Sequence, residues 1–134
     1  MNEIKKIIYI NMERRDDRRQ FMEKQLRGLG IDYERFSAVE PSIGGLVSPD
    51  GNHHEFFRRA IPRFKSYAEN PKLYKRAIGV FGAYISHRRI HQRMAAEQLG
   101  NYIILEDDCR VTPESLSKVL SKLDDGSIPS DWDI

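Results

Sequence analysis

Three consecutive carboxylates, Glu106, Asp107 and Asp108, directly follow the apolar run 102–105. Adjacent like charges repel one another, and a bound cation removes this conflict. Oxygen ligands of this kind suit Mg²⁺ or Mn²⁺ better than Zn²⁺. In an extended segment alternate side chains point the same way. We therefore expect Glu106 and Asp108 to face one metal site while Asp107 faces the opposite side.

Two interpretations of this acidic group remain open on the residues alone. Acidic side chains also favour the positive N-terminus of a following helix, which would make them surface residues without a ligand. The carboxyl end of a parallel strand, however, is where α/β folds place their ligands. Several phosphate-handling folds have acidic strand ends, so the group by itself predicts a metal and a phosphate rather than a sugar.

Histidine and serine chemistry has weaker support. His87 falls on the inward face of a predicted helix, where we interpret it as a core histidine with satisfied hydrogen bonds. No aspartate is placed to complete a triad with Ser86 and His87. His53 and His54 have no third well-spaced ligand, so we interpret them as loop residues rather than a zinc site.

Composition limits the classes of partner. The chain has 134 residues, 40% of them hydrophobic, and a net charge of +2, so it has no overall electrostatic attraction to nucleic acid. Its one cysteine, Cys109, cannot form an internal disulfide, and the N-terminus lacks the apolar stretch of a signal peptide. No apolar run reaches the ~18 residues needed to span a bilayer. We expect a cytoplasmic protein with at most a peripheral membrane association.

The elements that must position the acidic group begin with a short β-branched run at 7–10, which predicts a strand buried on both faces. A helix is predicted at 16–28 and a second strand at 33–39. This spacing predicts a βαβ unit with a parallel pair. A further strand is predicted at 102–105, and the next helix begins with Thr112 as cap and Pro113 at its first position, with an apolar stripe at Leu116, Val119, Leu120 and Leu123.

The middle of the chain is predicted to contain an irregular segment and then the main helix. Residues 40–78 contain scattered prolines and no persistent period, and their second half is basic. We interpret them either as a solvated loop or as a lid over an anionic substrate. Residues 79–99 predict a helix with one inward face, formed by Val80, Ala83, His87, Ile90 and Met94. The whole pattern predicts a single α/β domain over 1–134, with a mostly parallel sheet flanked by helices.

Four segments in fixed order resemble glycosyltransferase family 25, the lipooligosaccharide and lipopolysaccharide galactosyltransferase family. They are IYINMERRDDR at 8–18, GVFGAYISH at 79–87, IILEDD at 103–108 and DWD at 131–133. The resemblance implies a GT-A-like, Rossmann-like fold in which this chain is the nucleotide-sugar-binding half. Domains of the family are longer, so the resemblance also implies that this domain is incomplete.

The resemblance implies roles for individual residues. Glu106 and Asp108 would be the catalytic and metal-binding acidic pair, in the manner of the Asp-x-Asp motif of GT-A enzymes. Gly79 and Gly82 would let the start of the main helix approach the donor. The full set of implied cofactor-binding residues is Asn11, Arg14, Arg18, Gly79, Gly82 and Asp107.

The implied function is transfer of a hexose, specifically galactose, from a UDP-sugar to a saccharide of the lipooligosaccharide or lipopolysaccharide core. An inverting displacement assisted by Mn²⁺ or Mg²⁺ is expected, by an enzyme that is cytoplasmic or peripheral at the inner membrane. A divalent cation would stabilise the diphosphate leaving group as a Lewis acid. Two alternatives remain: a non-catalytic remnant that binds a nucleotide sugar or a partner, and a different metal-dependent phosphate enzyme.

Overall fold

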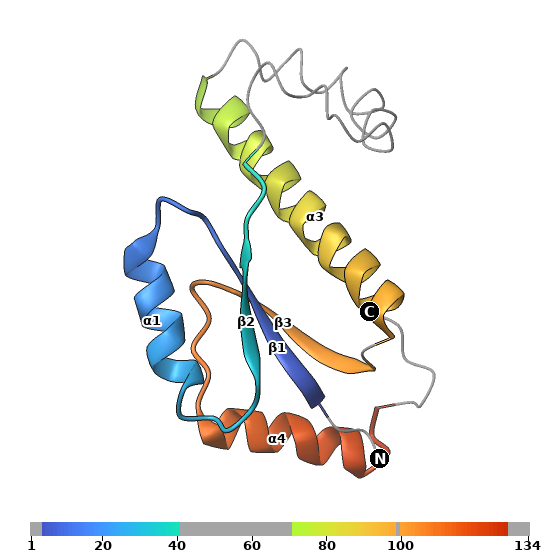
Figure 1. Ribbon diagram of the computed structural model, residues 1–134. Coiled ribbons are helices and arrows are strands. Elements are labelled where there is room, and N and C mark those ends of the chain that lie inside the picture. The colour runs from blue at the N-terminus through green and yellow to red at the C-terminus, as the bar shows by residue number, and fades with distance from the viewer. Residues whose placement is uncertain (1–3, 41–70, 99, 129–134) are drawn as a thin grey trace. The chain divides into compact units, whose positions relative to one another are not determined.

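The computed structural model describes residues 4–40, 71–98 and 100–128. The segment 41–70, which contains His53, His54 and much of the predicted basic loop, and the DWD segment at 131–133 lie outside these residues. In chain order the elements are β1 (Ile4–Asn11), α1 (Asp16–Leu26), β2 (Tyr33–Ser37), α3 (Pro71–Glu97), β3 (Asn101–Glu106) and α4 (Pro113–Asp124) (Figure 1).

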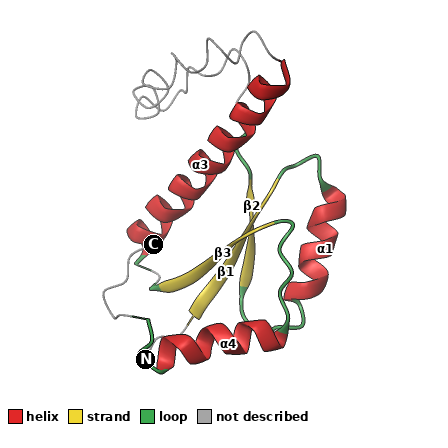
Figure 2. Ribbon diagram, turned by 180° about the vertical axis from the view of Figure 1, so that it is seen from behind, coloured by secondary structure: helices red, strands yellow, loops and turns green. Residues whose placement is uncertain are grey.

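The strands form one parallel sheet in the order β2-β1-β3 (Figure 2). On one side of β1, Tyr9 pairs with Arg35, and on the other side Tyr9 pairs with Leu105. The central strand β1 is buried from Ile7 to Asn11. An apolar run without alternation fits this position, because helices cover both faces of such a sheet. The prediction of an α/β fold with a parallel sheet and flanking helices is confirmed.

One face of the sheet packs against α1. Its core consists of Ile7 and Tyr9 from β1 and Met22 and Leu26 from α1, each 1% exposed or less. Alternate residues of a strand share a face, so residues 7 and 9 point together toward the helix. Half-buried side chains surround this core, namely Leu29, Ile31, Tyr33, Ile103, Leu105 and Cys109.

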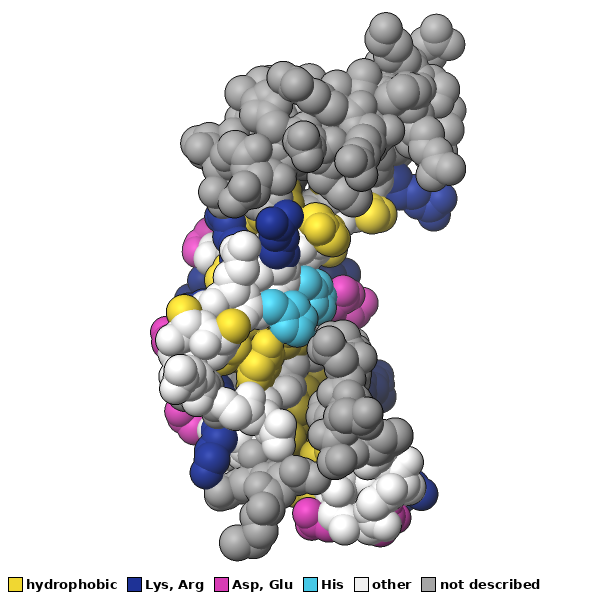
Figure 3. Space-filling model, turned by 90° about the vertical axis from the view of Figure 1, so that its right-hand side faces the viewer, with side chains coloured by type: hydrophobic (Ala, Val, Ile, Leu, Met, Phe, Trp, Pro, Cys, Tyr) yellow, Lys and Arg dark blue, Asp and Glu magenta, His cyan; other side chains and the backbone are white. Residues whose placement is uncertain are grey.

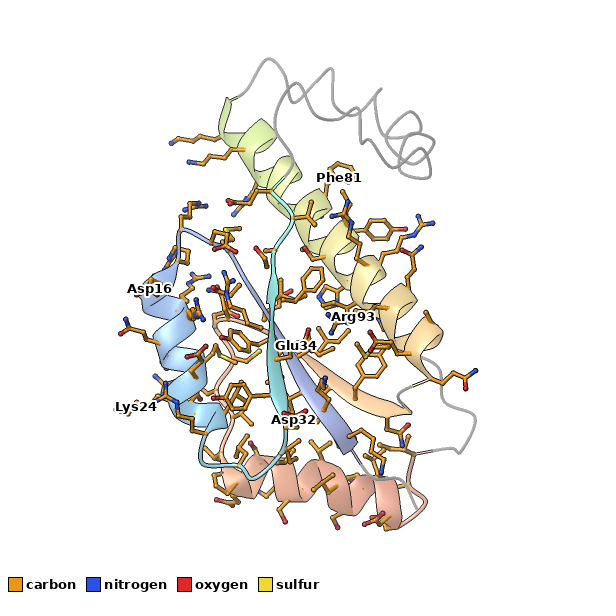
Figure 4. All side chains as sticks on the ribbon, viewed as in Figure 1. Asp16, Lys24, Asp32, Glu34, Phe81 and Arg93 are labelled. Carbon is orange, nitrogen blue, oxygen red and sulfur yellow. The ribbon has the colours of Figure 1, made fainter. Side chains whose placement is uncertain are left out.

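The other face of the sheet is bordered by the C-terminal part of α3. There His91 Nδ1 lies 2.7 Å from the hydroxyl of Tyr102 on β3. Arg93 Nη1 lies 2.6 Å from Glu34 Oε1, and these two side chains point toward one another in Figure 4. Lys6 also donates to Glu34, at 3.2 Å. Burial acts to raise the pKa of Glu34, but the hydrogen bonds from Arg93 and Lys6, together with the positive charges of these residues, lower the pKa below its usual value.

The described residues divide into two compact units, and α3 contributes to both. One unit contains 4–37, 90–98 and 100–128, which include the sheet, α1 and α4. The other contains 38–40 and 71–89. Within the second unit the buried hydroxyl of Ser86 donates to Gly82 O at 2.7 Å and accepts from Val39 N at 2.9 Å.

The main helix differs from its prediction in length and in buried face. It begins at Pro71, so the prediction of an irregular segment is wrong for 71–78. A proline suits the first turn of a helix because the N–H that it lacks would have no partner there. Val80 and Ala83 are exposed. Among the residues of this helix whose burial the structure describes, the buried ones are Gly82, Ile85, Ser86, Ile90 and Met94.

The last helix begins as predicted, with a capping box between Thr112 and Ser115 and Pro113 in its first turn. Leu116 and Leu123 are buried, but Val119 is 46% exposed, so its place in the apolar stripe was wrong. Within residues 4–40, 71–98 and 100–128, no helix combines the length and apolar content needed to cross a bilayer.

Candidate functional site at the carboxyl ends of the strands

The strand order creates a distinctive point at the carboxyl ends of β1 and β3. The chain passes from β1 to β2 on one side, and β3 then lies on the other side of β1. In open α/β sheets ligands bind outside the carboxyl ends of the strands at such a reversal. β1 ends at Asn11 and β3 ends at Glu106. Residues at these ends are therefore the structural candidates for a ligand site.

A buried amide–carboxylate pair joins the two strand ends. Asn11 is 1% exposed, and its Nδ2 donates to Asp107 Oδ2 at 2.9 Å. The same nitrogen donates to the backbone carbonyl of Arg15 at 3.0 Å. Ile10 pairs with Glu106 across the strands, which brings the following residues, Asn11 and Asp107, together. Two residues predicted to bind the cofactor are thus in direct contact with each other.

Arg18 completes the pairing of Asp107. Its Nη1 donates to Asp107 Oδ1 at 3.1 Å, and Asp107 is only 8% exposed. A buried carboxylate is costly unless it is paired and hydrogen-bonded, and both of its oxygens are satisfied here. The structure therefore gathers Asn11, Arg18 and Asp107, although they come from a strand, a helix and a turn.

Arg35 on β2 is a further member of this group that the sequence did not reveal. Its Nε donates to Asn11 Oδ1 at 2.9 Å, and its Nη1 donates to Glu13 Oε1 at 3.1 Å. The hydroxyl of Ser37 also donates to Glu13, at 2.7 Å. The hydrogen bond from Ser37 is the largest cause of a lowered pKa of Glu13, and the hydrogen bond from Arg35 lowers this pKa further. The sequence offered one signal for this role of Arg35, a charged residue in the middle of a short predicted strand. The sequence could not identify the partner of Arg35, because that depends on the register between β1 and β2.

The acidic run forms a turn rather than an extended segment. β3 ends at Glu106, and Cys109 N donates to Glu106 O at 3.2 Å. The prediction that the extended geometry continues to Asp108 was therefore wrong. Exposure still alternates, because Glu106 and Asp108 are exposed whereas Asp107 is buried. The turn thus presents two carboxylates to the solvent and directs the third toward Asn11 and Arg18.

Gln25 on α1 holds the segment that follows this turn. Its Nε2 donates to Cys109 O at 3.1 Å, and its Oε1 accepts from Val111 N at 2.9 Å. One amide group therefore satisfies two backbone groups of a connecting segment. This contact ties the acidic turn to the helix that also carries Arg18.

The other predicted site residues lie elsewhere. Arg14 is exposed on the loop after β1, with Nη2 at 3.3 Å from Met12 Sδ. Gly79 and Gly82 lie inside α3, in the second unit, so the prediction that they form the start of the helix was wrong. A Cβ at Gly79 would meet nothing within 4 Å, whereas Gly82 is buried.

The histidines have no catalytic arrangement in the part of the chain that the structure describes. His87 is half-buried rather than fully buried, and His91 is exposed and paired with Tyr102. Figure 3 shows histidine side chains at the surface of the molecule. The hydroxyl of Ser86 donates a hydrogen bond to Gly82 O and accepts one from Val39 N.

The carboxylates suit a cation shared with a phosphate ligand. Among the described residues no group of three or more His, Cys, Asp or Glu side chains could hold a metal ion by itself. Mg²⁺ and ions like it commonly bind through one or two carboxylates together with substrate phosphates and water. Glu106 and Asp108 are two exposed oxygen donors of this type.

Comparison with known proteins identifies the family. The profile of glycosyltransferase family 25, described as an LPS biosynthesis protein, matches residues 4–130. The chain belongs to glycosyltransferase family 25. The matched range includes the first strand, the glycine-containing part of α3 and the acidic turn.

Individual relatives support the assignment to family 25. A glycosyltransferase 25 family member of Aedes aegypti is 30% identical over 128 residues, covering 96% of this chain and 20% of the relative. One from Anopheles gambiae matches with the same identity and coverage. Procollagen galactosyltransferase 1-B of Xenopus laevis is 28% identical over 129 residues, again covering 96% and 20%. The chain thus spans about a fifth of the length of these family 25 relatives. No solved structure matches it significantly.

Proposed function

We propose that this family 25 chain binds the nucleotide-sugar donor of a glycosyl transfer reaction. The donor would be a UDP-hexose, specifically UDP-galactose, because a relative is named as a procollagen galactosyltransferase. The acceptor would be a saccharide of the lipopolysaccharide core, since the family is described by lipopolysaccharide biosynthesis. Transfer would then release UDP and form a new glycosidic bond.

The observation that carries this proposal is the contact between Asn11 and Asp107. It joins the carboxyl ends of β1 and β3 where the strand order reverses, which is where α/β folds bind nucleotides. On either side of Asp107, Glu106 and Asp108 are exposed. This arrangement supports the proposal that the diphosphate of the donor binds beside these carboxylates.

The chemistry requires stabilisation of a leaving diphosphate. A divalent cation supplies Lewis-acid stabilisation of the charge that grows on the leaving oxygens. In this proposal Glu106 and Asp108 hold that cation. Arg14, exposed on the loop after β1, offers a guanidinium that can bind phosphate oxygens in bidentate geometry. Arg18, ion-paired with Asp107, holds the buried carboxylate in place.

Ligand-induced stabilisation tests donor binding. UDP or UDP-galactose with Mn²⁺ should raise the melting temperature, and ATP with Mn²⁺ should not. At a ligand concentration of about 100 times Kd the expected stabilisation is about 2.7 kcal/mol. Stabilisation by ATP or a simple phosphate ester, without any effect of UDP, would instead support a different metal-dependent phosphate enzyme.

A binding role without turnover is the second candidate. It is favoured by the contacts of Asn11, Arg18 and Asp107, which are made within the protein and suit a preformed binding site without themselves supplying a reacting group. Release of UDP from UDP-galactose in the presence of a core oligosaccharide acceptor would distinguish the two. Turnover that disappears in Asp108→Ala supports the enzyme, whereas tight UDP binding without turnover supports the binding role.

A further inference from the structure

The orientation of the Asn11 side chain is fixed by its neighbours. Its Oδ1 faces Arg35 Nε, which can only donate, and its Nδ2 faces the oxygens of Asp107 and Arg15, which can only accept. A flipped amide would place donor against donor and acceptor against acceptors. Only one orientation of Asn11 therefore satisfies this environment.

Both donor hydrogens of the Asn11 side chain, and one acceptor site of its oxygen, are already used within the protein. Both hydrogens of Nδ2 are donated, to Asp107 and to the carbonyl of Arg15, and Oδ1 accepts from Arg35. The backbone oxygen of Asn11 also accepts from Arg35 Nη2 at 3.4 Å. The side chain is buried, with 1% of the residue exposed. The Asn11 side chain thus has no donor left for a nucleotide unless these bonds break.

Arg35 is suited to impose this orientation. Its side chain is 17% exposed, and its fork of donors reaches Asn11 from one side and Glu13 from the other. A rigid planar fork holds two acceptors at fixed positions, which a lysine cannot do. Arg35 lies on β2, whereas both of its partners lie at or just after the end of β1.

We propose that Arg35 is a positioning residue of the donor site and that Asn11 acts through it without touching the ligand. Arg35 fixes the Asn11 amide, and the amide holds Asp107 between the two exposed carboxylates of the acidic turn. Loss of Arg35 releases this amide and loosens the placement of Glu106 and Asp108. This inference rests on the proposed function, because donor binding is the activity that the placement serves.

The test compares Arg35→Met, Arg35→Lys and the matched control Arg27→Met. Methionine preserves aliphatic bulk without a donor, and lysine preserves the charge without the fork. Arg27 is 70% exposed and is ion-paired with Glu23, away from the strand ends. Calorimetry with UDP and Mn²⁺, well below each melting temperature, should show Kd raised about tenfold by Arg35→Met. The increase should be smaller for Arg35→Lys and absent for Arg27→Met.

A second readout reports on the amide itself and requires no ligand. In the unaltered protein the two side-chain amide hydrogens of Asn11 should exchange slowly with solvent in NMR spectra. These hydrogens should exchange faster in Arg35→Met and Arg35→Lys. If Arg35→Met does not fold, the comparison is made between the unaltered protein and Arg35→Lys.

The outcomes separate this inference from the proposed function. If the unaltered protein does not bind UDP, the proposed function fails, and the amide exchange still tests the role of Arg35. If it binds UDP and the Arg35 variants bind equally well, the positioning role is overturned. Unchanged protection of the Asn11 amide in both Arg35 variants would also overturn it.

Discussion

At the residue scale, three adjacent carboxylates in the acidic turn have different surroundings. Asp107 is buried against Asn11 and Arg18, whereas Glu106 and Asp108 are exposed. Burial with paired hydrogen bonds makes a carboxylate structural, whereas exposed carboxylates are of the type that Mg²⁺ and similar ions bind. Substitutions at neighbouring positions should therefore have different consequences.

Asp107→Asn should lower stability, and Asp108→Asn should not. The amide at 107 carries no charge for Arg18 and offers one acceptor oxygen instead of two, so we expect a loss of about 2 kcal/mol. Asp108→Asn should change stability by about 0.5 kcal/mol or less but weaken Mn²⁺-dependent UDP binding. Urea denaturation and UDP titration measure the two effects. An equally large loss of stability in Asp108→Asn would show that Asp108 is structural.

Exchange of the paired groups tests the contact between the two strand ends. Asn11→Asp places a second carboxylate against Asp107 and should cost about 3 kcal/mol or more. Asn11→Asp combined with Asp107→Asn restores one amide–carboxylate bond in the reverse sense. The double variant should therefore be more stable than the sum of the single effects predicts, as measured by a double-mutant cycle. Simple additivity would mean that the two side chains do not interact.

At the element scale, Tyr9 and Glu23 join β1 to α1. The buried Tyr9 hydroxyl donates to Glu23 Oε1 at 2.7 Å. Burial and this hydrogen bond raise the pKa of Tyr9 to about 12, while the same bond lowers the pKa of Glu23. The contact thus adds one directed bond to the apolar packing of Met22 and Leu26.

The Tyr9 contact predicts a specific alkaline response. Because the folded pKa lies above the unfolded value of about 10, its contribution is complete below pH 10 and disappears as pH rises through 12. Tyr9→Phe should lose about 1–2 kcal/mol at pH 7 and should flatten this alkaline decline. Denaturation from pH 7 to 12 measures it, with Tyr33→Phe on β2 as the control. The same alkaline slope in Tyr9→Phe would contradict the assignment.

Some elements could be predicted because their signals are local. The apolar run of β1 and the capping residues of α4 depend on neighbours in sequence, and both were confirmed. The start of α3 was missed because Pro71 was interpreted as part of an irregular segment. The turn after Glu106 was missed because the acidic residues alone do not show where a strand ends.

At the scale of the whole molecule, the strand order positions the candidate site. Only the order β2-β1-β3 places the reversal between the ends at Asn11 and Glu106. The sequence predicted the parallel βαβ unit, and family resemblance indicated Asn11, Arg18 and Asp107, which the structure brings together. Arg35 could not be predicted, because its contact depends on the register between β1 and β2.

The central strand should dominate global stability. Ile8 on β1 is completely buried, so Ile8→Ala should cost about 2–5 kcal/mol through lost burial and the cavity that remains. Val119 on α4 is 46% exposed, and Val119→Ala should cost about 0.5 kcal/mol or less. Denaturant titration of both variants measures this. Equal losses would show that the sheet does not form the core of the folded chain.

The hydrogen bonds of the Asn11 side chain also have a consequence for chemical ageing. Asparagine is among the thermolabile residues, and its deamidation requires the side chain to rotate toward the following backbone nitrogen. Arg35, Asp107 and the carbonyl of Arg15 prevent this rotation. Deamidation of Asn11 to aspartate would place a second carboxylate against Asp107. The hydrogen bonds that this reaction would break therefore also protect Asn11 from it. Stored or heated protein should deamidate at Asn11 only after this part of the molecule has opened.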